Sequence, residues 1–325
     1  MKAFLLKRLP QLGLLLVIVL MAGFFAARQP LFLTSGTVAQ MFKYYSPLAM
    51  MALGMTLIIL TGGIDLSVGY AMMFVMFVMA GLIRDHPEIN PFLAMGAGLI
   101  AALLVGTVIG GSVAFARIPA FIISLAVMVA AYGVTLVISQ NQSISHLPKA
   151  LLWLGGESFS VGHEDYPMML PVVLVAYGLV ALLLNRTRFG RHLYAIGSNR
   201  EAARLSGIPV KRVELTAYLL SAVCVWIAAI MQIGLNRNAD PKVALSDSLE
   251  LNAIAAVVIG GTSLTGGRGG VSGTALGMLL LALLFLGLDL SGIHEPSYKK
   301  MIQGGIICLG AVLDAYQRRR ANANA

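Results

Sequence analysis

The sequence predicts an all-α, polytopic membrane helical bundle of about ten transmembrane helices, with two glycine-rich helix breaks and both termini in the cytoplasm. Three observations support this fold. Of the 325 residues, 58% are hydrophobic and only 11% are charged, whereas a soluble domain is about 25% charged. Apolar runs close to the roughly 20 residues that cross a bilayer recur along the whole chain. Lys and Arg gather in alternate connections between these runs.

The apolar runs give the expected helices in order. The first extends from Leu9 to Ala27 after a basic N-terminus, a pattern shared with signal peptides, but the later runs favour a retained first helix. Two runs, 46–61 and 250–260, are short and end in glycine pairs. The others are 66–83, 92–115, 120–139, 168–185, 214–234, 271–289 and 300–316. We expect one transmembrane domain over residues 1–325 and no soluble domain.

The orientation follows from the basic residues in the connections. Counted with the N-terminus inside, about fifteen Lys and Arg fall on the cytoplasmic side and about eight outside, the bias expected for cytoplasmic termini. The largest cytoplasmic loop is 186–213. The longest outside loop, about 140–167, could be a lid, a docking surface or a plain connector.

The net charge of +9 needs no nucleic-acid partner, because cytoplasmic Lys and Arg make membrane proteins basic. No basic patch is interleaved with aromatic residues, so we expect no nucleic-acid binding. Cys224 and Cys308 lie in apolar runs without CxxC or CxxH spacing, and we interpret both as small buried hydrophobes. We expect no metal site.

Two glycine-rich stretches resemble each other, L-T-G-G-I-D-L-S-V-G at 60–69 and I-G-G-T-S-L-T-G-G-R-G-G at 259–270. Each ends a short apolar run, and the expected helix-break residues are Gly62, Gly63, Gly260 and Gly261. Paired interruptions can mark unwound helices on a transport route. The alternative is two glycine-rich connections at the membrane face.

Asp65 lies between two apolar runs, and an acidic residue in that setting is a functional hypothesis. It also fits the start of the next helix, where its side chain could accept backbone N–H bonds. We favour the capping role over direct substrate contact, and the two roles are compatible.

The stretch S-N-R-E-A-A-R-L-S-G-I at 198–208 predicts a short amphipathic helix in the cytoplasm. Either Ser198 or Asn199 can cap it, and Ser198 with Glu201 fits the S-x-x-E capping box. Gly207 ends the helix, and Pro209 prevents it from resuming. By pattern alone such a helix could lie on the membrane surface.

These motifs together carry a family resemblance. The E-A-A and glycine spacing in a cytoplasmic loop resembles the coupling loop of ABC importer permeases. The chain is similar to the ribose-type, carbohydrate-importing permease family from about residue 44 to the C-terminus. The stretches that carry the resemblance are 62–69, 118–125, 186–199, 201–208, 251–269 and 311–314.

The resemblance implies a bacterial inner-membrane subunit that is not an enzyme and works as one of a pair of permeases, identical or sibling. Substrate would come from a periplasmic binding protein, and a cytoplasmic ABC ATPase would drive transport. The ATPase-coupling residues carried over are Glu201, Ala202, Ala203 and Gly207. The chain has no G-x-x-x-x-G-K-S/T phosphate loop, so ATP and Mg would be bound by the ATPase and no cofactor by this chain.

One departure from the family pattern concerns the substrate. The family usually has E-L-D-A-I-A-A, where this chain has Asn252 in place of the aspartate, after a polar and basic stretch at 235–244. If that region meets substrate, the specificity can differ from ribose. The candidates for the substrate path are Asp65, Ser67, Asn236, Asn252, Thr262 and Ser263, although helix–helix hydrogen bonds explain such residues equally well.

The function that follows is a permease for a small sugar or sugar-like solute. A stand-alone secondary transporter is the alternative, but it would place ionisable residues at mid-membrane, and we count almost none apart from Asp65 and Asp289. An intramembrane enzyme is disfavoured, since no HExxH motif or catalytic pair occurs.

Overall fold

A computed structural model describes residues 2–162, 164–293, 295, 297–305, 308 and 312. Among these residues, eight helices are long and apolar enough to cross a bilayer, which confirms a helical, polytopic membrane bundle. They are α1 (Lys2–Arg28), α2 (Ser35–Leu60), α3 (Val68–Asp85), α4 (Pro91–Ala114), α5 (Ala120–Ser139), α7 (Met169–Arg186), α10 (Val210–Asn236) and α13 (Val271–Leu290).

The remaining two of the ten expected spans have different outcomes. The run 250–260 corresponds to α12 (Leu249–Ile259), whose 11 residues are too few to cross a bilayer alone. It is preceded by the short α11 (Val243–Asp247). The run 300–316 lies largely outside the described residues.

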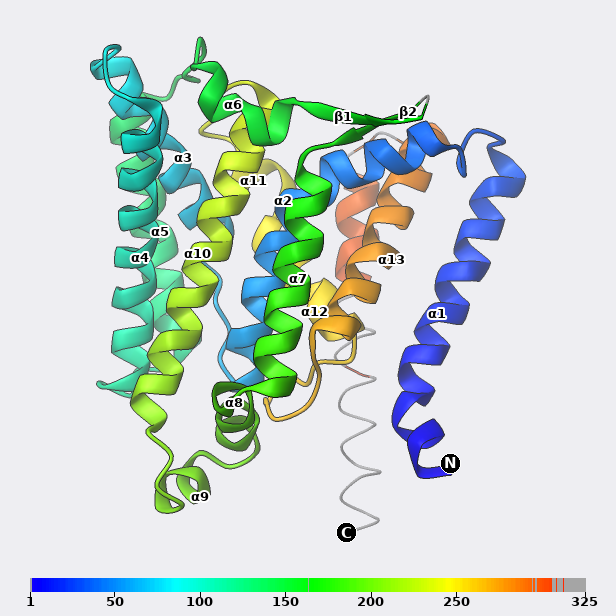
Figure 1. Cartoon of the computed structure of the whole chain (residues 1–325), viewed down its shortest axis with the longest axis vertical. Helices are drawn as coiled ribbons and strands as arrows, with labels where there is room; N and C mark the ends of the chain where they lie inside the picture. The colour runs from blue at the N-terminus through cyan, green and yellow to red at the C-terminus, as the bar shows by residue number, and fades with distance from the viewer. Residues whose placement is uncertain are drawn as a thin grey trace.

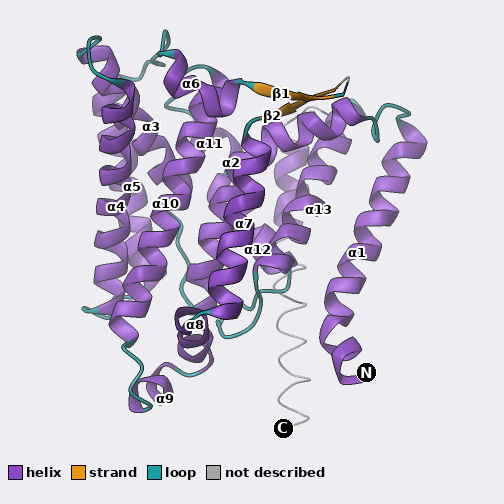
Figure 2. Cartoon of the chain, in the orientation of Figure 1, coloured by secondary structure: helices purple, strands orange, loops and turns teal. Residues whose placement is uncertain are grey.

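The two ends of the bundle carry different short elements (Figure 1). One end has α6 (Lys149–Gly156) and an antiparallel hairpin of β1 (Ser158–Val161) and β2 (Glu164–Pro167). The opposite end has α8 (Arg188–Ser198), α9 (Arg200–Leu205) and the first turn of α1. Figure 2 shows the hairpin, a feature that the all-α expectation did not include.

The helix α2 is longer than the short run expected at 46–61. It begins at Ser35, and the side chain of Thr34 accepts the N–H of Thr37 at its start. Pro47, inside the helix, has no N–H to donate, and such a residue bends a helix. In Figure 1 the first turns lie along the hairpin end and the rest descends through the bundle. The expected short run is therefore the arm after Pro47.

Helix α10 is the centre of the bundle and packs against α2, α3, α4 and α6. Glycines allow these close contacts. A β-carbon at Gly110 of α4 would lie 2.7 Å from Cβ of Tyr218, and one at Gly106 would lie 3.0 Å from the Tyr218 carbonyl oxygen. Between helices in lipid there is no hydrophobic driving force for association. The close packing that this G-x-x-x-G face allows therefore holds α4 against α10.

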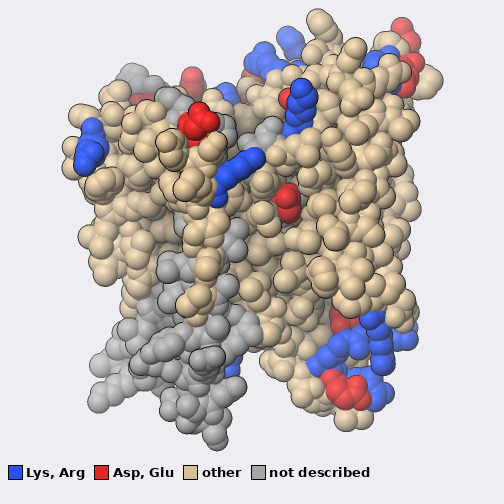
Figure 3. Space-filling model, turned by 180° about the vertical axis from the view of Figure 1, so that it is seen from behind, with Lys and Arg blue, Asp and Glu red and all other residues tan. Residues whose placement is uncertain are grey.

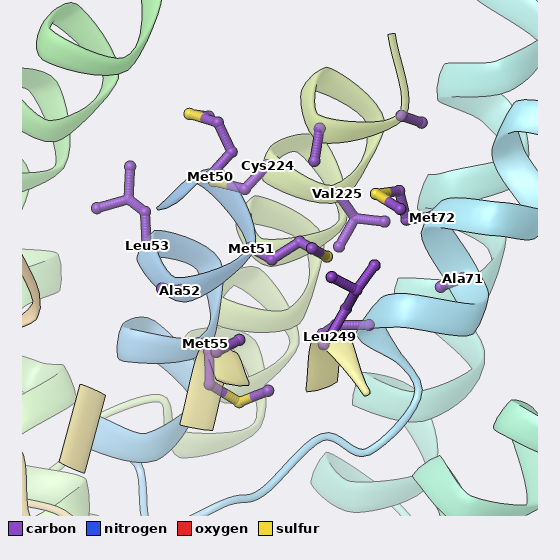
Figure 4. Packing of buried hydrophobic residues seen from close by; sticks show 14 of the residues in the cluster. Met50, Met51, Ala52, Leu53, Met55, Ala71, Met72, Cys224, Val225 and Leu249 are labelled. Atoms are coloured by element: carbon purple, nitrogen blue, oxygen red, sulfur yellow. The ribbon is translucent and has the colours of Figure 1, made fainter. Parts of the chain in front are cut away.

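The core beside α10 contains many methionines (Figure 4). Met51 and Met55 of α2, Met72 of α3 and Cys224 of α10 are buried together. The interpretation of Cys224 as a small buried hydrophobe is therefore confirmed. For Cys308 it is wrong, since no described part of the chain covers that side chain.

The surface of the bundle matches a bilayer. On the face shown in Figure 3, Lys, Arg, Asp and Glu gather mainly toward the two ends, with an uncharged band between them. Large apolar side chains are exposed along α1, α4, α5 and α7, for example Leu20, Leu104, Val137 and Leu179. These residues face lipid or another membrane subunit.

The packing of α4 on α10 gives a first prediction. Gly110→Ala should destabilise the protein by about 1–3 kcal/mol, because the added methyl overlaps Tyr218. Gly111→Ala is the matched control, since a β-carbon there meets nothing within 4 Å and alanine favours the helix. Thermal unfolding of the detergent-purified protein measures both. Equal melting temperatures for the two variants would contradict the packing.

Candidate functional site

The loop between α7 and α10 begins with a helix that sequence analysis missed. Thr187 caps α8 by accepting the N–H of Gly190 at 3.3 Å. Leu193 and Ile196 are buried and Phe189 packs against the core, while Arg191 is exposed. The apolar spacing of 189, 193 and 196 is the helical signal that could have revealed α8.

The predicted short helix is α9, and its two ends are built by local hydrogen bonds. Asn199 caps it, accepting the N–H of Ala202 at 2.9 Å. At the other end Gly207 has φ +79°, and the N–H groups of Gly207 and Ile208 bond to the carbonyls of Arg204 and Ala203. This is a Schellman motif, which stops the helix at the expected glycine.

The capping box that the sequence suggested is not formed. The hydroxyl of Ser198 donates to the carbonyl oxygen of Tyr194 at 2.9 Å. The Glu201 carboxylate instead accepts from Arg204, and this neighbour holds the pKa of Glu201 below its usual value. Asn199, the other candidate, therefore caps the helix.

Helix α9 protrudes from the end of the bundle (Figure 1). Glu201, Ala202 and Gly207 are exposed, and Ala203 faces inward and is buried. Leu205, which sequence analysis did not select, is 75% exposed at the tip. A short, capped helix that presents a carboxylate and an apolar side chain can serve as a docking element for another protein.

An ion pair ties α9 to the central helix. Arg200 Nε and Nη2 donate to the two carboxylate oxygens of Glu214 on α10, at 2.7 and 2.9 Å. The Glu214 side chain is only 5% exposed, and its carboxylate raises the pKa of Arg200. Two parallel bonds to a buried carboxylate hold the direction of α9 relative to α10.

The two glycine breaks end their helices in the same way. Gly62 after α2 has φ +85° and Gly261 after α12 has φ +87°, and each is the left-handed residue of a Schellman motif. The sequence motifs align Gly62 with Gly260, whereas the structure pairs Gly62 with Gly261. Gly260 has another role, since a β-carbon there would lie 2.3 Å from the backbone of Gly273 on α13.

Helix α8 contacts both breaks at a single point, which we name the glycine junction (Leu60, Gly62, Gly197, Gly266 and Gly267). The N–H of Gly267 donates to the Leu60 carbonyl at 3.0 Å. A β-carbon at Gly197 would lie 2.0 Å from that carbonyl oxygen and 2.3 Å from the Gly267 nitrogen. Three segments far apart in sequence therefore meet there through their backbones.

Beyond the first break, the chain returns into the bundle as an extended segment (Figure 1). There Asp65 Oδ1 accepts the N–H and the hydroxyl of Ser67, at 2.8 and 2.6 Å. The N-cap of α3 is Ser67, so Asp65 supports the helix start from two residues earlier and is not the cap residue itself. Asp65 and Ser67 line a narrow cavity with Tyr218 and Ser221 of α10.

The six substrate-path candidates do not form one site. Asp65 and Ser67 share the narrow cavity, and Asn236 is exposed at the hairpin end of α10. Thr262 and Ser263 are buried in the loop near α8, where Thr262 Oγ1 accepts the N–H of Gly270 at 3.3 Å. Asn252 is buried in α12.

The helices contain more buried acidic side chains than the sequence led us to expect. Glu214 and Glu250 are both buried in helices, 4% and 9% exposed. Sequence analysis placed each at the edge of an apolar run and gave neither a role. Among the described residues, no three His, Cys, Asp or Glu side chains group as metal ligands would.

The family described as "Branched-chain amino acid transport system / permease component" matches residues 37–310. The chain belongs to this family. It is the multi-pass membrane permease component of a bacterial ABC importer and is not itself an enzyme.

Similar proteins cover nearly the whole chain. It is 36% identical over 320 residues to the ribose import permease protein RbsC of Escherichia coli (strain K12), covering 96% of this chain and 94% of that protein. It is 31% identical to the L-arabinose ABC transporter permease protein AraH of Azospirillum brasilense, covering 96% and 89%. It is also 31% identical to the fructose import permease protein FrcC of Rhizobium meliloti, covering 89% and 81%. No solved structure matches the chain.

The ion pair between α9 and α10 gives a second prediction. Arg200→Met should destabilise the purified permease by about 2 kcal/mol, because it leaves the Glu214 carboxylate buried without its partner. Arg204→Met is the matched control, since Arg204 and Glu201 are both exposed and their pair adds little to stability. Thermal unfolding in detergent compares the two. Equal destabilisation by both variants would contradict a structural role for the Arg200 pair.

Proposed function

We propose that this permease moves a small sugar or sugar-like solute, delivered by a periplasmic binding protein, across the bacterial inner membrane. The observation that carries this proposal is identity along nearly the full chain to permeases named for ribose, L-arabinose and fructose. The family description names branched-chain amino acids. The full-length relatives favour a sugar, because their similarity includes the helices that would line the path.

The loop 186–213 is proposed as the coupling loop to a cytoplasmic ABC ATPase. Glu201, Ala202, Ala203 and Gly207 build the helix that would enter a cleft of that subunit. The capping by Asn199 and the Schellman end at Gly207 support this role, because they hold α9 as a preformed helix at the tip of the bundle. ATP and Mg would be bound by the ATPase.

Two physical connections lead inward from the coupling loop. The Arg200–Glu214 pair joins α9 to α10, whose Tyr218 and Ser221 line the cavity beside Asp65. Gly197 of α8 joins the loop to both breaks at the glycine junction. A displacement of α9 would therefore be transmitted to the two glycine breaks, which contain Gly62, Gly63, Gly260 and Gly261.

The remaining parts of the proposal concern topology and assembly. The coupling loop and both termini would be cytoplasmic, with about ten crossings in all. Exposed apolar side chains on α4, α5 and α7 offer surfaces for lipid and for a second permease, identical or sibling. The hairpin, tied to α2 by the 2.5 Å bond from the Ser35 hydroxyl to Glu164, would face the binding protein.

Uptake tests the substrate class and the energy source together. Right-side-out vesicles containing this chain, its ATPase and its binding protein should accumulate a labelled pentose or hexose only with internal ATP. A proton ionophore should not stop this uptake, because no ion gradient drives it. Uptake that persists without the ATPase would instead establish the alternative, a stand-alone secondary transporter.

Substitution of Gly207 tests the coupling loop. Gly207→Val should reduce the ATPase recovered with the tagged permease by about tenfold, because a β-branched residue is strained at φ +79°. Gly207→Asn is the control, since asparagine tolerates the left-handed conformation and a β-carbon there meets nothing within 4 Å. Equal recovery of ATPase with both variants would show that the ending of α9 does not matter for docking.

A further inference from the structure

A buried carboxylate at the start of α12 has no role in the coupling described above. Glu250 lies in the first turn of α12 and is 9% exposed. Its Oε2 atom is buried and has no hydrogen-bond partner among the described residues. A buried carboxylate oxygen without a partner is costly, so a group that arrives during function is the natural partner for it.

The surroundings of Glu250 are built from two helix starts. A β-carbon at Gly69, in the first turn of α3, would lie 2.8 Å from Glu250 Oε2. Leu249 packs into the core beside α3 (Figure 4), which leaves the next residue directed along the first turn of that helix. The N-termini of α3 and α12 favour negative charge, which offsets part of the cost of burying the carboxylate there.

Aromatic side chains continue from the carboxylate toward a hollow in the surface. Tyr70 follows Gly69 in the first turn of α3 and is partly buried. Its ring meets the Tyr132 ring of α5 edge-on, with centroids 5.9 Å apart. Tyr132 in turn lines an open hollow with Asn141 and Leu245, and both tyrosines are partly exposed.

We propose that Glu250, Tyr70 and Tyr132 form a contact site for a polyhydroxylated solute within the transport path; this rests on the proposed sugar function. The carboxylate oxygen accepts hydroxyl hydrogen bonds, and the two phenol groups donate and accept them. The tyrosine rings pack against the C–H faces of a sugar ring. One unpaired acceptor beside two aromatic rings gives a weak site that releases its solute, as a path requires.

The test uses the whole transporter, with the permease, ATPase and binding protein reconstituted in liposomes. Glu250→Gln and Tyr132→Phe should each slow sugar uptake by about tenfold, since each weakens a hydrogen bond to the passing solute. Stimulation of ATP hydrolysis by the sugar-loaded binding protein should be unchanged, because the coupling loop is distant from Glu250. Glu88→Gln, an exposed acid between α3 and α4, is the matched control and should transport normally.

A second measurement separates contact from structural support. The uptake rates of the sugar and of its monodeoxy analogues are compared in wild type and in Glu250→Gln. For one analogue, the ratio of its rate to that of the sugar should change by about tenfold in the variant, because only one hydroxyl meets the carboxylate. Normal uptake by Glu250→Gln would overturn the inference, as would loss of assembly or a parallel loss of ATP hydrolysis. The inference would also be overturned if organic cations, and not other sugars, inhibited sugar uptake by the wild-type protein. Wild-type protein that transports no sugar would refute the proposed function itself.

Discussion

The contact between the Leu60 carbonyl, the Gly267 N–H and the backbone of Gly197 is the constraint on which the end of the bundle next to α8 depends. Three chain segments meet there at distances that leave no room for a side chain. In a bilayer, backbone groups at a helix end must find protein partners, and this junction supplies one. The end of α2, the loop after α12 and the amphipathic α8 therefore hold their positions relative to each other.

The same need for hydrogen-bond partners applies to the buried polar side chains of this mostly apolar chain. Glu214 is buried with two hydrogen bonds from Arg200, so it holds α9 in place. Asp65 is buried with two bonds from Ser67 and shapes the start of α3. Glu250 is buried with one oxygen that finds no hydrogen-bond partner among the described residues, which is why it differs in kind from the other two. Pairing thus distinguishes groups that support the fold from a group available to a solute.

Several features followed from local sequence. The ending of α9 at Gly207 was predictable because only glycine adopts φ +79° readily and Pro209 follows. The bounds of α5, Ala120–Ser139, coincide with the predicted run because Pro119 starts it and no charged residue interrupts it. By contrast, α2 extends to Ser35 through Lys43 and Tyr44, polar residues that a hydropathy window excludes, and Pro47 bends the helix without ending it.

The sequence by itself determined that this is a multi-span membrane protein with a capped helix in a polar loop, because apolar length, glycine, proline and capping residues act within a few positions of the chain. Only the tertiary structure decided which polar residues meet. The pairing of Arg200 with Glu214, the placement of Gly197 on both breaks and the approach of Gly69 to Glu250 join segments from 14 to 181 residues apart. Such contacts depend on how the helices pack, and nothing in the local pattern of either partner specifies that packing.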